Sequence, residues 1–88
     1  MYIVYWLIAE NRFKTYLGFT SDLENRLKKH RTKQVKSTKD FGEFKCFIIE
    51  KAINIVQARK REKYWKSCIG RKKLEKVFKK YFNPGPIV

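Results

Sequence analysis

Glu62 stands where a helical pattern predicts an apolar side chain. Counted along a helix, it falls between Ala58 and Trp65 on one face. A carboxylate on an apolar face costs free energy unless a cation compensates it. Magnesium could do so, because it commonly takes one or two protein carboxylates and keeps several waters. An ion pair with Arg59 or Lys66, one helical turn away on either side, explains the residue equally well. The pattern alone leaves both interpretations open.

Arg26 and His30 lie one helical turn apart, so on a helix they project from a common face. An arginine can hold a phosphate in a bidentate fork and stabilise charge that develops during phosphoryl transfer. A histidine can move a proton near neutral pH. The alternative is an ordinary solvated basic face, since Lys28 and Lys29 are close by.

Tyr5 and Tyr16 are the other candidates for chemistry. Most tyrosines in strands serve packing. A phenol with a pKa of about 10 is a poor base in water, but a nearby cation or metal lowers that pKa. Two tyrosines on one sheet face, an Arg/His pair and an inward carboxylate would together form a set able to hydrolyse a phosphodiester.

The tyrosines need a hairpin to meet. Tyr2–Ile8 is rich in β-branched and aromatic residues and predicts a strand buried on both faces, and Phe13–Phe19 predicts a second. A turn of two or four residues around Glu10 would place Tyr5 directly opposite Tyr16 on one face. A three-residue loop would break this match.

Helices should follow the hairpin. Ser21 and Glu24 have the spacing of a capping box and predict a helix that fades after His30 into a basic loop. Phe44–Ile49 predicts a third strand.

Asn54 is the predicted N-cap of a second, long helix that reaches about Ile69 and ends at Gly70. Apolar positions from Leu74 to Tyr81 predict a short third helix, which Asn83 and the following proline would stop. We therefore expect one α+β domain over residues 1–88, with a three-stranded antiparallel sheet flanked by helices in the order β-β-α-β-α-α.

The charge points to a polyanion as the partner. Lysine and arginine number 22 against 8 acidic residues in a chain of 88, a formal net charge of +14. Nucleic acid is the leading candidate, because each neutralised phosphate releases condensed counterions. An anionic membrane surface is the weaker rival, since no segment shows a polar face opposite a long, uninterrupted apolar one. Cys46 and Cys68 follow no metal-binding or disulfide pattern, so we expect reduced thiols and a cytoplasmic protein.

The sequence also resembles the GIY-YIG nuclease superfamily over nearly its whole length. The likeness is to small stand-alone members related to the N-terminal nuclease domain of the excision repair endonuclease. Val, Trp and Leu replace Gly, Ile and Ile of the two signature triplets, and both tyrosines are kept. The matching segments are Val4-Tyr5-Trp6, Tyr16-Leu17-Gly18, the stretch from Thr20 to His30, Lys36-Ser37-Thr38, Ala58 to Glu62, and Asn83-Pro84.

This resemblance implies a metal-dependent endonuclease that cleaves DNA, in repair, recombination or the processing of structured DNA. Glu62 would hold one Mg²⁺ or Mn²⁺ ion, and Tyr5, assisted by His30 or Tyr16, would help to deprotonate water. Arg26 would stabilise charge on the phosphate. Four further residues would contact nucleic acid: Lys36, Thr38, Lys39 and Asn83. Gly18 would let the backbone approach the substrate or a packed helix closely.

Two other functions stay open. One is an RNA- or ribosome-associated basic protein, which would share the charge but would not require Glu62. The other is a catalytically weak or inactive basic module that binds DNA or RNA, because a fold alone does not assign a substrate. We expect a monomer or a weak homodimer, with no membrane partner and with RNA retained as a second possible substrate.

Overall fold

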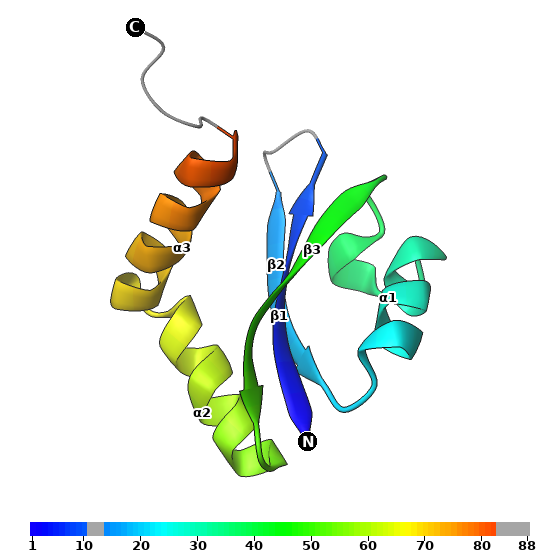
Figure 1. The fold of residues 1–88 in the computed structure, drawn as a ribbon. Coiled ribbons are helices and arrows are strands. Elements are labelled where there is room, and N and C mark those ends of the chain that lie inside the picture. Colours follow the sequence, from blue (N-terminus) through cyan, green and yellow to red (C-terminus); the bar gives the residue numbers. More distant parts are fainter. Residues whose placement is uncertain (11–13, 83–88) are drawn as a thin grey trace, which may run out of the picture.

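The computed structural model describes residues 1–10 and 14–82 (Figure 1). It contains three strands and three α-helices in the order β-β-α-β-α-α, so the predicted α+β fold is confirmed. The elements are β1 (Tyr2–Ala9), β2 (Thr15–Thr20), α1 (Leu23–Arg31), the single 3₁₀ turn η1 (Lys36–Thr38), β3 (Phe44–Ala52), α2 (Ile55–Lys66) and α3 (Cys68–Phe82).

The three strands form one antiparallel sheet in the order β2-β1-β3. The sequence of β1 suits the central place, because Tyr5 and Trp6 are the only side chains with polar atoms among residues 4–9. All six of these residues are buried. Figure 1 shows α1 on one side of the sheet and α2 with α3 on the other. The sheet is therefore the middle of three layers.

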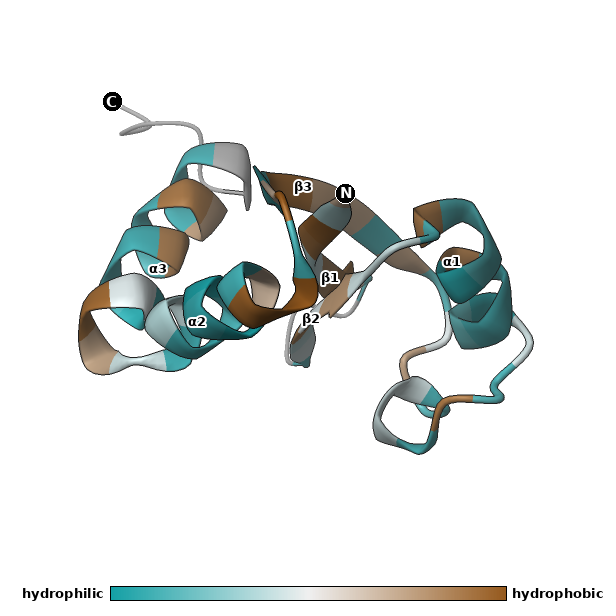
Figure 2. Cartoon of the chain, turned by 90° about the horizontal axis from the view of Figure 1, so that it is seen from below, coloured by the Kyte–Doolittle hydropathy of each residue, from teal (hydrophilic) through white to brown (hydrophobic). Residues whose placement is uncertain are grey.

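Each face of the sheet carries its own apolar cluster. Alternate β1 residues divide between the two, as the period of two in a strand requires. One cluster joins Val4, Trp6, Ile8 and Leu17 to Leu74 of α3, and the other joins Tyr5, Leu7, Ala9 and Phe41 to Leu23 and Leu27 of α1. Figure 2 shows the hydrophobic strands between helices whose outer surfaces are largely hydrophilic. Within the described chain, no helix is both long and apolar enough to cross a membrane.

The predicted strand pairing was wrong by two residues. Tyr5 lies opposite Gly18, and Tyr16 lies opposite Leu7. A one-residue shift would have moved Tyr16 to the other face, but a shift of two keeps it on the same face. The two tyrosines are diagonal neighbours with ring centroids 6.1 Å apart. Their predicted common face is thus correct although their predicted opposition is not.

The start of α1 also differs from the prediction. Asp22, not Ser21, is the N-cap, and its carboxylate accepts a hydrogen bond from the Asn25 backbone N–H at 3.1 Å. The Thr20 hydroxyl accepts from the Asp22 backbone N–H at 3.1 Å and fixes the chain just before the helix. Aspartate caps a helix as well as serine does, and its charge is favourable at the positive N-terminal end.

The boundary between the second and third helices lies earlier than predicted, so the second is shorter and the third longer than expected. Asn54 caps α2 as expected, accepting from the Gln57 backbone N–H at 2.9 Å. The helix ends at Lys66, however, and α3 begins at Cys68. Ile69, expected on the buried stripe, therefore belongs to α3 and is 62% exposed.

Gly70 does not end a helix; it lies within the first turns of α3. A Cβ atom here would overlap the backbone of Tyr64 and Trp65 in the last turn of α2. The missing side chain lets α3 turn tightly across the end of α2. The prediction failed because a glycine suits both a helix end and a close helix contact, and the sequence does not separate the two.

Candidate active site

Tyr5 is the buried centre of a polar cluster on the α1 side of the sheet. It is 1% exposed, on the central strand, and Gly18 faces it from β2. A Cβ at Gly18 would lie 3.1 Å from the Tyr5 hydroxyl oxygen and 2.8 Å from Cε1 of Tyr16. Gly18 was expected to let the backbone approach a substrate or helix; it instead provides the space that the two tyrosine side chains occupy.

His30 reaches this cluster from the last turn of α1 and is 2% exposed. Its Nε2 lies 2.8 Å from the Tyr5 hydroxyl oxygen, and its Nδ1 lies 2.6 Å from Oγ1 of Thr38. The Tyr16 ring packs edge-on against the imidazole, with centroids 5.1 Å apart. Residues far apart in the sequence are thus joined in one buried hydrogen-bonded chain.

The partners of Thr38 indicate the tautomer of His30. The Thr38 hydroxyl is placed to donate to the Val35 carbonyl oxygen, 3.5 Å away. We therefore assign the hydrogen bond between Thr38 and His30 to an Nδ1–H donor. Nε2 is then the acceptor of the Tyr5 hydroxyl proton.

Burial shifts the pKa values of both groups toward their neutral forms. Desolvation lowers the pKa of His30 below its usual 6.5, and the positive charge of Arg26 lowers it further. Desolvation raises the pKa of the Tyr5 hydroxyl, and Tyr16 raises it again, while Arg26 acts in the opposite direction. The cluster at neutral pH therefore contains a neutral phenol bonded to a neutral imidazole.

Arg26 is half-buried on α1, one turn before His30. Its charge acts on the pKa values of both Tyr5 and His30, so the guanidinium lies within electrostatic range of the cluster. The structure thus brings together four of the five predicted catalytic or metal-binding residues around the α1 face of the sheet.

Glu62 is not joined to that cluster. It lies on α2, in the layer on the other side of the sheet. Its carboxylate is half-buried and forms an ion pair with Lys66 at 3.7 Å, one of the two partners considered from the sequence. The pair is long and partly exposed, so it holds the carboxylate only weakly.

The residues predicted to contact nucleic acid fall into three groups. Lys36 is the first residue of the η1 turn and Lys39 follows its last, and both are exposed where a polyanion can reach them. Thr38 is 2% exposed and bonded to His30, so the expected contact with nucleic acid is replaced by an internal one. Asn83 lies outside the described residues.

Among the described residues, no three His, Cys, Asp or Glu side chains gather as potential metal ligands. A site that relies on one carboxylate, with water and phosphate oxygens completing the shell, is compatible with this composition. The ion pair of Glu62 with Lys66 is long, so its carboxylate oxygens are accessible to such an ion.

The family model of the GIY-YIG catalytic domain matches residues 1–76. The chain belongs to the GIY-YIG family. The match spans the sheet, α1, α2 and much of α3, and it gives the chain a nuclease-type fold. A search of the curated proteins and a search of the solved structures each return no significant match.

Within this GIY-YIG domain, sequence reasoning missed the contact between Thr38 and His30. The signal was weak, since Thr38 stands among exposed, basic and hydroxyl-bearing residues typical of a surface loop. A polar residue becomes informative when it is buried, because it then needs a partner. Only the folded chain shows which hydroxyl of this loop turns inward.

Proposed function

We propose that this GIY-YIG protein is a divalent-metal-dependent endonuclease that hydrolyses phosphodiester bonds in DNA. The observation that carries the proposal is the buried hydrogen-bonded chain from Tyr5 through His30 to Thr38. The charge of +14 supports nucleic acid as the substrate, since contacts with phosphates release counterions. We propose one nuclease domain over residues 1–88, acting in repair, recombination or the processing of structured DNA.

Tyr5 would act as the group that takes a proton from the attacking water. Because burial raises its pKa, the hydroxyl is not ionised in advance. The Tyr5 oxygen would accept the water proton while its own proton passes to Nε2 of His30, 2.8 Å away. The new bond joins the water oxygen to phosphorus, and the bond from phosphorus to the leaving oxygen breaks.

Arg26 and Tyr16 would act on the phosphate side of the same cluster. Arg26 carries a permanent positive charge and would stabilise the negative charge on the phosphate as it becomes five-coordinate. Tyr16 is less deeply buried than Tyr5, and its ring rests against His30. It would orient the imidazole and face the incoming substrate.

Glu62 would hold the divalent ion; α2, which carries it, contacts the edge strand β2, which carries Tyr16, so the ion would act from that edge of the sheet. When bound, Mg²⁺ or Mn²⁺ would neutralise charge on the scissile phosphate and the leaving oxygen. The exposed Lys36 and Lys39 would hold flanking phosphates, which position a substrate without reading its sequence. A cytoplasmic location and a monomer or weak homodimer remain predictions from the sequence.

One specific observation favours a second function. The Glu62 carboxylate pairs with Lys66 and lies in a different layer from the tyrosines. A domain in which this carboxylate never meets the tyrosine cluster would bind DNA or RNA without cleaving it. We retain a catalytically inactive nucleic-acid-binding module as the alternative.

A cleavage assay separates the two functions. The purified chain is incubated with single-stranded, duplex, nicked and branched DNA, and with RNA, in Mg²⁺, Mn²⁺ or EDTA. Glu62→Gln is compared with Glu75→Gln, because Glu75 also forms an ion pair with a lysine one turn later but lies on α3. Arg26→Ala is compared with Lys28→Ala on the same helix.

The nuclease proposal expects metal-dependent cleavage that is lost by about a hundredfold or more in Glu62→Gln and Arg26→Ala. Both control variants should cleave as the unaltered chain does, and all four should still bind DNA. Cleavage that is equal in all variants would identify a contaminant. Binding without cleavage of any substrate would establish the alternative.

A further inference from the structure

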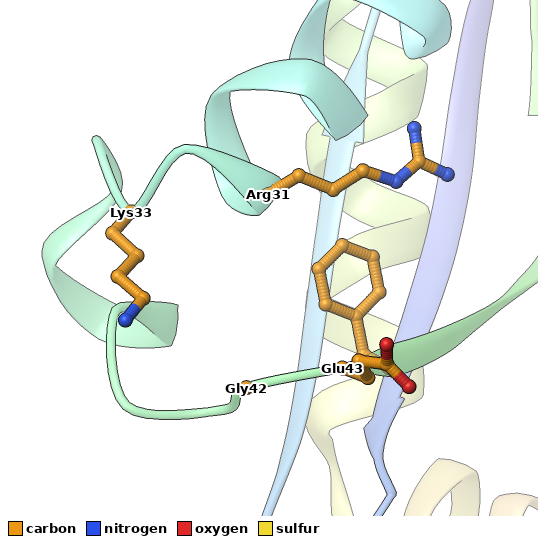
Figure 3. Close-up of a pocket in the computed structure, with 5 residues that line it drawn as sticks. Arg31, Lys33, Gly42 and Glu43 are labelled. Carbon is orange, nitrogen blue, oxygen red and sulfur yellow. The ribbon is translucent and has the colours of Figure 1, made fainter.

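A solvent-open pocket of about 450 Å³ lies beside the candidate active site, at the end of α1 and the start of β3. Arg31, Lys33, Gly42, Glu43 and Phe44 line it. Figure 3 shows Arg31 extending from the helix end, with Lys33 and Glu43 on opposite sides. The volume is within the range of pockets that bind small ligands.

Phe44 connects this pocket to the tyrosine and histidine cluster. Its ring packs edge-on against His30, with centroids 6.2 Å apart, while it also lines the pocket. A ligand resting on Phe44 would therefore be a near neighbour of His30. The pocket is thus separated from the candidate active site by the ring of Phe44 and lies directly beside it.

Lys33 occupies a backbone position that favours glycine. Its φ is 61°, and its N–H donates to the His30 carbonyl oxygen while that of Gln34 donates to the Lys29 carbonyl oxygen. These two bonds define the helix-ending motif in which glycine is the usual residue. A lysine here costs stability, so we take its side chain to be the reason for its presence.

The same left-handed conformation recurs across the pocket. Within residues 1–10 and 14–82, the positive-φ residues are Lys33 and Gly42, and both line it. Chain segments on both sides of the pocket thus adopt conformations that ordinary residues avoid. Glycine adopts this conformation without strain, so Lys33 is the residue of the two whose type the backbone does not favour.

The Arg31 guanidinium lies over the Phe44 ring at 5.9 Å from the ring centroid. This distance is close to the outer limit of about 6 Å for a cation–π contact, so the two groups are not closely stacked. A flat ring inserted between the two would need about 7 Å, which the exposed Arg31 can reach by a small rotation. An aromatic base fits this arrangement.

The pocket is lined by both positive and negative side chains. A simple anion such as phosphate is therefore not the ligand that fits it best. Arg31 and Lys33 would attract phosphate, but the Glu43 carboxylate would oppose a ligand that consists of phosphate alone. A nucleotide has both parts, because its phosphate suits the cations and its base suits the aromatic ring. The amino group of a base can also donate to a carboxylate.

From these contacts we propose that the pocket binds one unpaired nucleotide of the DNA substrate. Its base stacks between Phe44 and Arg31, and its phosphate meets Lys33. The proposal rests on the proposed nuclease function and specifies its substrate as DNA with unstacked bases, such as a flap or a branch. Bases in an intact duplex stay stacked and do not enter the pocket.

Binding is measured with labelled single-stranded and duplex DNA of equal length, in EDTA and at one ionic strength. Lys33→Gly is the central variant, because glycine suits the backbone there and the fold should be kept or stabilised. Lys72→Ala is its control, since it removes one exposed positive charge on α3. Phe44→Leu removes the ring and keeps an apolar side chain.

We expect Lys33→Gly and Phe44→Leu to weaken single-strand binding by about tenfold. Duplex binding should fall no more than it does in Lys72→Ala. A fluorescent adenine analogue in the single strand should be quenched by the unaltered protein and not by Phe44→Leu. If Lys33→Gly weakens both DNA forms by the same factor as Lys72→Ala, the pocket does not select unpaired nucleotides.

Cleavage assays on the same variants separate this proposal from the nuclease function. Selective single-strand binding that depends on Lys33, without metal-dependent cleavage, would refute the nuclease and keep the pocket. Metal-dependent cleavage in which Lys33→Gly retains the substrate preference of the unaltered protein would support the nuclease and refute the nucleotide pocket. Because Lys33→Gly decides both cases, a folding failure of Phe44→Leu would not leave the proposal untested.

Discussion

The Tyr5 hydroxyl oxygen and Nε2 of His30 lie 2.8 Å apart, although 25 positions separate them in the sequence. Both groups are buried, and the other imidazole nitrogen is held by Thr38 at 2.6 Å. A strand, a helix end and the η1 turn thus meet along one buried hydrogen-bonded path. Changing the groups along this path should therefore alter cleavage or stability in measurable ways.

Thr38→Val should slow cleavage by about tenfold or more. Valine has nearly the same shape as threonine but cannot accept from Nδ1–H, so the His30 tautomer is no longer fixed. An unpaired buried nitrogen should also lower the free energy of unfolding by about 1–3 kcal/mol. Single-turnover rates and urea unfolding are the measurements.

Thr38→Ser is the control, because it keeps the hydroxyl. Thr38→Ser should cleave at nearly the rate of the unaltered protein and keep the low-pH limb of its pH–rate profile, whereas Thr38→Val should shift that limb. A purely structural role of Thr38 would leave the limb in place in both variants. Cleavage by Thr38→Val at the rate of the unaltered protein would exclude Thr38 as the positioning residue of His30.

Stability should fall as the pH is lowered below about 6.5. Desolvation, then the charge of Arg26, lowers the pKa of His30 in the folded state below its usual 6.5. Between these two pKa values the unfolded chain binds a proton that the folded chain does not, so acid favours unfolding. Above 6.5 both states are neutral and the effect disappears.

Urea unfolding of the unaltered chain and of His30→Gln, from pH 5 to pH 8, measures this slope. The variant lacks the imidazole and should show less dependence on pH in that interval. An identical dependence in both proteins would assign the slope to other groups.

Gly18→Ala should affect activity more than stability. The added Cβ would lie 2.8 Å from Cε1 of Tyr16, which is far along a side chain that can move. We expect the free energy of unfolding to fall by about 1 kcal/mol, the lower end of the cost of overpacking, because the Tyr16 side chain can shift. Cleavage should fall by about tenfold or more, because a catalytic group displaced by even 1 Å loses rate. Loss of stability without loss of specific activity would contradict this.

Gly70→Ala should affect stability more than activity. The added Cβ would overlap the backbone of Tyr64 and Trp65, which cannot move without separating α3 from α2. We expect the free energy of unfolding to fall by about 1–3 kcal/mol. Thermal or urea unfolding is the measurement, with Lys72→Ala as an exposed α3 control. A variant as stable as the control would mean that the helix junction is looser than described.

Local patterns in the sequence predicted most of the elements correctly. Tyr5 and Tyr16 lie on the same face because side chains alternate along strands, and that result survived a pairing error of two residues. Asn54 caps α2 because a short side chain meets backbone groups only three residues away. Such interactions are local, so the local sequence specifies them.

The three-stranded α+β fold, the family and a charge suited to a polyanion could all be inferred from the residues alone. The folded chain was needed to show that Thr38 turns inward to His30 and that Gly70 serves a helix crossing. Thr38 depends on how the loop after α1 packs against that helix, and Gly70 depends on how α3 crosses the end of α2. Their residue types suit several environments, and only the burial of each site in the folded chain selects one.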